Sequence, residues 1–90
     1  MNKIKALNIL RKSGQKNIVE VSMQPGEYLD KHSHDSNADI IILEGSLQIN
    51  FQKKVKVLSA GERFRFKKNI QHTEYSGVEG VFFLSARPNK

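Results

Sequence analysis

Short apolar segments separated by turn signals run along most of the chain, and this pattern constrains the fold more than any other feature. Apolar and polar residues alternate over residues 19–23 and 47–51, while residues 40–43 and 81–84 are continuous apolar runs. Gly, Pro or Asn residues interrupt these segments at intervals of about 8–12 residues, which is typical of β-sandwiches and β-barrels. The sequence therefore predicts an all-β fold with roughly seven or eight short strands.

The N-terminal segment is the one part of the chain with a different pattern. Ile4, Leu7 and Leu10 have a spacing that places them on one side of a short amphipathic helix, although an edge strand fits so short a piece equally well. Ser13-Gly14 then predicts a break. A chain of 90 residues has room for one hydrophobic core, so we expect a single domain over residues 1–90.

Composition removes several classes of site. The chain has no cysteine, which excludes disulfides, thiolate metal sites, iron–sulfur clusters and a cysteine nucleophile. A small domain without disulfides depends on an efficient core, a bound metal or a partner subunit. No apolar run approaches the length of a membrane span, and the N-terminus lacks the features of a signal peptide, so we expect a cytoplasmic protein without a membrane partner.

The net charge of +6 raises the question of a nucleic-acid partner. Lys54 and Lys56, like Arg63 and Arg65, alternate with apolar residues, which places them on the solvent face of strands. We therefore regard nucleic-acid binding as unlikely and expect the intervening residues 64 and 66, both Phe, to belong to the core rather than to a base-stacking platform.

Three histidines carry the strongest chemical signal. His32 and His34 are two residues apart, so on a strand their side chains point to the same face. His72 lies in a different segment that could fold beside the first. Three neutral imidazoles suit a divalent transition metal such as Fe, Zn, Ni or Cu, and they leave coordination positions open for water or a ligand. The alternative is that His32 and His34 are ordinary surface residues of a polar turn.

The context of the histidines resembles a known family. The stretch Gly26–His34 resembles the first motif of the cupin superfamily, Gly45 matches the glycine that closes this motif, and Gly61–His72 resembles the second motif. The resemblance covers about residues 18–85. It implies a single cupin-type β-barrel (a jelly roll, or double-stranded β-helix), preceded by a short helix or edge strand. It also implies a divalent metal ion, with Fe, Zn, Ni or Mn as candidates, held by His32, His34 and His72.

The sequence departs from the family motifs at three positions. Ala38 stands where the first motif has a glutamate, Lys67 where the second has a proline, and Asn69 where it often has a glycine. Asn tolerates a left-handed backbone, so the last change is mild. Asp39 could replace the missing glutamate only if a β-bulge turned it to the histidine face.

Other polar residues near the motifs have weaker signals. Tyr28 and Asp30 share the parity of His32, which would place them along the pocket, although we favour packing within a turn. Glu74 and Tyr75 follow His72 and could orient a ligand or transfer a proton, but we expect ordinary strand residues. No residue is convincing as a general base, so the catalytic residues stay unknown.

Two functions remain open. The first is a small metal-binding cupin that binds a small anionic or chelating molecule and acts as a dioxygenase or isomerase. The second is a non-catalytic barrel that binds or senses a small ligand with or without metal, because Ala38 removes a ligand from the family set. We also expect a homodimer, and Val19, Val21, Ile41 and Leu43 have the apolar character to form its contact.

Overall fold

Two long antiparallel strands organise the fold. The computed structural model describes residues 1–14 and 17–87. Within these residues the chain forms one helix and a six-stranded sheet. The elements are α1 (Lys3–Lys12), β1 (Asn17–Met23), β2 (Tyr28–His32), β3 (Ala38–Phe51), β4 (Lys54–Ser59), β5 (Arg63–Phe66) and β6 (His72–Arg87).

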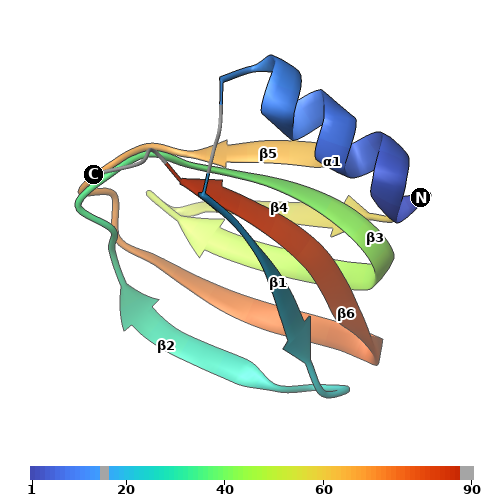
Figure 1. Ribbon diagram of the computed structural model, residues 1–90. Coiled ribbons are helices and arrows are strands. Elements are labelled where there is room, and N and C mark those ends of the chain that lie inside the picture. Colours follow the sequence, from blue (N-terminus) through green and yellow to red (C-terminus); the bar gives the residue numbers. More distant parts are fainter. Residues whose placement is uncertain (15–16, 88–90) are drawn as a thin grey trace.

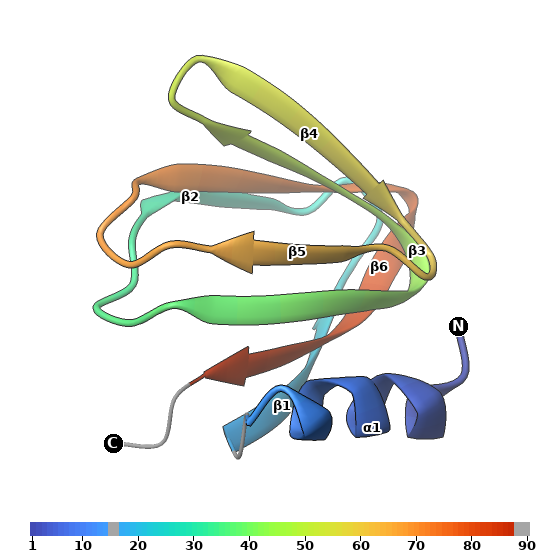
Figure 2. The same ribbon diagram turned by 90° about the horizontal axis from the view of Figure 1, so that it is seen from above.

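The strands follow the order β1-β6-β3-β4, with β2 added to β6 and β5 added to β3, and every pairing is antiparallel. The sheet curls around its interior without closing, and α1 lies across the outside of β3 and β6 (Figures 1 and 2). This arrangement is consistent with a jelly roll, so the predicted all-β cupin-type fold is confirmed.

Both long strands bend at glycines. The register of β3 against β6 shifts on either side of Gly45, and Gly45 and Gly80 both have a φ of 78°. A Cβ atom on Gly45 would overlap the carbonyl oxygen of Gly80, so only glycine allows the two strands to approach this closely. β3 therefore continues well beyond the apolar run of residues 40–43, because the bulges bend it at Gly45 instead of ending it.

Two apolar clusters lie on opposite faces of the sheet. The inner cluster is formed by alternate residues of the strands: Met23, Ala38, Ile40, Ile42, Leu47, Ile49, Leu58, Phe66, Val81 and Phe83. The outer cluster lies beneath α1: Ala6, Leu10, Ile41, Leu43, Leu84 and Ala86. The predicted core position of Phe66 is confirmed, and Phe64 packs partly buried against the same cluster.

The N-terminal segment is the helix rather than the edge strand. The Asn2 side chain accepts hydrogen bonds from the backbone N–H groups of Ile4 and Lys5, which caps the first turn. Ala6 and Leu10 are fully buried, whereas Ile4 is 69% exposed, so the predicted buried side was right for Leu10 and wrong for Ile4. α1 covers Ile41 and Leu43, which are therefore not accessible for the predicted homodimer contact, while Val19 on β1 is exposed.

The turns agree with the sequence. Gln52 and Lys53 both have positive φ at the tip of the β3–β4 hairpin, and Asn69 adopts the left-handed conformation with a φ of 64°.

The one helix of the described chain is too short and too polar to cross a membrane.

Candidate metal centre

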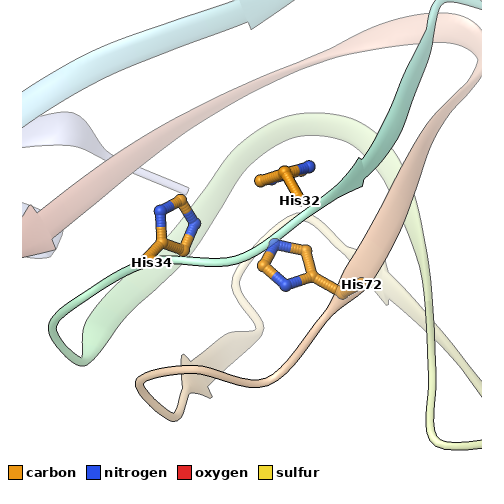
Figure 3. A group of neighbouring side chains, drawn as sticks. All are labelled: His32, His34 and His72. Carbon is orange, nitrogen blue, oxygen red and sulfur yellow. The ribbon is translucent and has the colours of Figure 1, made fainter.

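The three histidines lie side by side at one end of the inner face. His32 ends β2, His34 lies two residues further along in the loop, and His72 begins β6 directly opposite His32. Figure 3 shows the three rings gathered where β2 and β6 meet. Each histidine has one ring nitrogen that lies within 4.8 Å of a ring nitrogen of each of the other two. The structure thus brings together all three residues that the sequence singled out.

Backbone carbonyls fix the orientation of two of the rings. Nδ1 of His32 lies 2.7 Å from the carbonyl oxygen of Asp30, and Nδ1 of His72 lies 3.1 Å from that of Ile70. A carbonyl can only accept, so Nδ1 of each ring carries the proton and, in a neutral imidazole, Nε2 carries a free lone pair. Such outer hydrogen bonds are typical of histidines that ligate metals.

The Nε2 atom of His72 is buried and has no hydrogen-bond partner among the described residues. A buried nitrogen without a partner is unfavourable, and in native proteins such atoms usually have a partner. The atom lies 3.7 Å from the Glu74 carboxylate, which is too far for a hydrogen bond. A metal ion bound at this nitrogen would supply the missing partner.

Burial favours the neutral form of His34 and His72. It lowers the pKa of His72, and the charge of His32 adds to this effect. Burial, followed by the charges of Arg87 and the other two histidines, lowers the pKa of His34 to about 4. Neutral imidazoles are the form that binds metal, so neither residue needs to lose a proton at pH 7.

The separations are close to those of a bound ion. Nitrogen ligands at about 2.1 Å from one ion lie about 3 to 4.2 Å from each other, depending on the angle at the metal. The three histidine nitrogens lie within 4.8 Å of one another, which is slightly more than this range, so small side-chain rotations would bring them to ligand distance. The donor type, the protonation and the spacing therefore all fit a divalent transition metal.

Aromatic rings cover one side of the histidines, and a cavity opens beside them. The ring of Phe66 stacks on His72 with centroids 4.3 Å apart. A cavity of about 450 Å³ reaches His72 from outside and is lined by Phe51, Phe64, Phe66, Ile70, Lys54 and Lys67, among others. A hollow of similar size at the Gly45 bend contains none of the histidines. A wider hollow lined by Lys31, Asn50 and Thr73 also reaches His72, so a small molecule could approach the site from either cavity.

Asp39 is not part of this site. The pairing of Ala38 with Phe66, Asp39 with Arg65 and Ile40 with Phe64 is regular, without the bulge that would reverse Asp39. Ala38 and Ile40 belong to the inner cluster, whereas the Asp39 carboxylate is hydrogen-bonded to the side chains of Arg63 and Arg65. Asp39 is thus a structural residue of the other face.

The shared parity predicted for Tyr28, Asp30 and His32 was wrong. The pairing of β2 with β6 shifts between Leu29 and His32, and this irregularity reverses the direction of the side chains. Tyr28 is 53% exposed and packs edge-on against Tyr75. Asp30 is also exposed, so neither residue lines the histidine site.

Glu74 is the residue that sequence reasoning underrated. Its side chain is buried, and one carboxylate oxygen, Oε2, lies 3.0 Å from Nε2 of His32. The signal was its position two residues after His72, which places both side chains on one face of a strand. Tyr75 and Glu44, by contrast, are exposed.

The comparison with family models settles the family. The model described as "Cupin domain" matches residues 19–77. The chain belongs to the cupin family. The match includes both histidine segments and the Gly45 bend, so this cupin retains the parts of the fold that build the site.

Solved structures show the same fold. A cupin-2 domain protein from Shewanella frigidimarina is 27% identical with a TM-score of 0.65, and the match covers 80% of this cupin and 67% of that chain. An HTH_3 family transcriptional regulator from Vibrio cholerae is 21% identical with a TM-score of 0.69, over 81% of this cupin and 42% of that chain. A W96Y oxalate decarboxylase from Bacillus subtilis is 19% identical with a TM-score of 0.74, over 89% of this cupin and 23% of that chain. No curated protein sequence matches significantly.

Proposed function

We propose that this protein is a small metal-binding cupin in which His32, His34 and His72 hold one divalent transition metal ion, with Fe, Zn, Ni and Mn as candidates. One observation supports this most strongly. Two of the rings have Nδ1 on a backbone carbonyl, and the buried Nε2 of His72 has no hydrogen-bond partner among the described residues. The donor atoms come from two segments, which the pairing of β2 with β6 brings together.

The cavity beside His72 supports a small anionic or chelating ligand. Lys54 and Lys67 line it, and neither forms an ion pair within the described part of the chain. Arg65 also lines it but is 3.4 Å from Asp39, so its charge is partly committed. A carboxylate or similar group entering between the Phe rings would meet positive charge outside and the metal's open positions inside.

A bound metal would supply Lewis-acid chemistry or, as Fe(II), oxygen activation. The reaction classes that we propose are therefore isomerisation and dioxygenation. The chain's own residues would bind and orient the ligand: the lysines hold its charge, and Phe51, Phe64 and Phe66 keep water away from it.

A binding or sensing barrel without turnover is the second candidate. It is supported by the similarity to a transcriptional regulator, in which a domain of this fold makes up less than half of a longer chain. Metal binding and ligand capture are common to both candidates, and turnover of a bound ligand separates them.

We also propose a homodimer. Because α1 covers part of the apolar surface that the sequence indicated, the contact would involve the exposed side of β1, where Val19 is 46% exposed.

Metal analysis tests the metal site. We expect about one ion per chain after reconstitution with Fe, Zn, Ni or Mn, and a loss of binding of at least tenfold in His32→Ala, His34→Ala and His72→Ala. Gln71→Ala is the matched control, because Gln71 is the exposed neighbour of His72. Circular dichroism would verify that each variant is folded. Far less than one ion per chain after reconstitution with all four metals would contradict the metal site.

A further inference from the structure

The buried carboxylate of Glu74 is within ligand distance of the same ion. Glu74 is 6% exposed and lies on the side of β6 that carries His72. Its Oε2 is 3.0 Å from Nε2 of His32 and 3.7 Å from Nε2 of His72. Both separations fall within the range of about 3 to 4.2 Å expected between two ligand atoms of one ion.

Glu74 has no lysine or arginine as a direct partner that would explain its burial. Across residues 1–14 and 17–87, its ion pairs are those with His32 and His72, and the charge of Arg87 acts on it only from beyond ion-pair distance. The Nδ1 protons of both rings are directed to backbone carbonyls, so in the form that binds metal both rings present Nε2 lone pairs to the carboxylate. Two acceptors facing each other repel, and a cation between them turns this contact into an attractive one.

The alanine at position 38 leaves the site without the carboxylate that the first motif usually supplies. Ala38 faces the interior and is paired with Phe66, whose ring stacks on His72, but it has no oxygen to contribute. We propose that Glu74, on the strand of the second motif, is the fourth metal ligand and replaces the carboxylate that the first motif lacks. This inference rests on the proposed metal site and adds one negative charge to it.

The added ligand changes the class of metal and substrate. Three imidazoles and one carboxylate leave a divalent centre with a net charge of +1, and the oxygen donor suits Fe(II) or Mn(II) better than three nitrogens alone. His32, His34, His72 and Glu74 would hold the ion, and its remaining coordination positions would be available to an anionic ligand that enters from the cavity beside His72.

Cobalt titration tests the inference with a spectroscopic readout, because the visible absorption of Co(II) depends on its ligands. Glu74→Gln keeps the shape of the side chain and removes the charge. We expect the wild-type protein to bind one Co(II), and Glu74→Gln to bind about 10–100-fold more weakly with an altered visible spectrum. Glu79→Gln is the matched control, since Glu79 is an exposed glutamate on the same strand, and it should behave as the wild type.

Glu74→Asp distinguishes a ligand from a nearby charge. It retains the carboxylate but withdraws it by one methylene, so a direct ligand should give a changed spectrum and intermediate affinity. Wild-type affinity and spectrum in Glu74→Gln, or a wild-type spectrum in Glu74→Asp, would overturn ligation by Glu74 and leave the three-histidine site intact. Failure of the wild-type protein to bind Co(II) would overturn both the metal site and this inference.

Discussion

The two faces of the sheet each bury one carboxylate, and the two groups have opposite surroundings. On the outer face, Asp39 is 1% exposed and bonded to Arg63 and Arg65. Burial works against its ionisation, but the hydrogen bonds and charges of the two arginines hold its pKa below the ordinary value. On the inner face, burial raises the pKa of Glu74, and the nearby His32 offsets this only in part.

The difference shows that burial alone does not reveal the role of a carboxylate. Asp39 has its compensating charges within the fold, and Arg63 also donates a hydrogen bond to the Ser13 hydroxyl at the end of α1. Glu74 has no arginine or lysine as a direct partner among the described residues, and the charge of Arg87 acts on it from farther away. A carboxylate with its own arginines stabilises the fold, whereas one that lacks a permanent cation is suited to binding one.

The largest effect on stability is expected from Asp39→Asn. The substitution leaves Arg63 without its charged partner and removes charge-assisted hydrogen bonds, so the free energy of unfolding should fall by about 2 kcal/mol. For a domain of this size the melting temperature should fall by roughly 10 °C. The measurement is thermal unfolding of the metal-free protein. Glu20→Gln breaks an exposed ion pair with Lys3 and serves as the control, with an expected change below about 0.5 kcal/mol. Equal effects of the two substitutions would remove the structural role assigned to Asp39.

Glu74→Gln is expected to stabilise the metal-free protein, by less than Asp39→Asn destabilises it. Removing a buried charge that has no permanent counter-charge should raise the free energy of unfolding at pH 8 by about 1 kcal/mol. The same variant should bind metal less well, so stability and binding would change in opposite directions. Chemical denaturation with and without metal measures both, and Glu79→Gln should change neither. A destabilised metal-free Glu74→Gln protein would show that the two carboxylates have the same role.

The smallest expected effects are changes of stability with pH, and their pH ranges differ between the two carboxylates. The folded pKa of Asp39 is lowered, so its contribution is full above the unfolded value of 3.8 and is lost as the pH falls through the folded pKa. The folded pKa of Glu74 is raised, so the advantage of Glu74→Gln should be absent below the unfolded value of 4.5 and grow as the pH rises through the folded pKa. Denaturation curves of both variants between pH 3 and 8 would reveal these windows. An advantage of Glu74→Gln that persists unchanged at pH 3 would contradict the assignment.

Much of the fold could be predicted from local pattern. The strand character of β1 and β4 and the turn glycines are properties of a few neighbouring residues, and the structure has strands and turns there. The buried face expected from the alternation is missing in β4, where Val55 and Val57 are exposed. The three histidines were recognisable because two are close in sequence and the third lies at the family spacing, and the structure places them together.

What could not be predicted depends on contacts between distant strands. The reversal between Leu29 and His32 is a consequence of how β2 pairs with β6, and a parity argument on β2 alone misses it. The continuity of β3 through Gly45 depends on its close approach to Gly80. Glu74 looked ordinary because its importance comes from His32, which lies on another strand.

The tyrosine pair described on β2 and β6 gives this molecule a built-in optical reporter. The chain contains two tyrosines and no tryptophan, so Tyr28 and Tyr75 dominate its intrinsic near-ultraviolet emission. Their ring centroids are 6.3 Å apart on the outer surface of the two strands whose inner surface carries His32, His72 and Glu74. The fluorescence of the unlabelled protein therefore reports on the pairing of the strands that form the site.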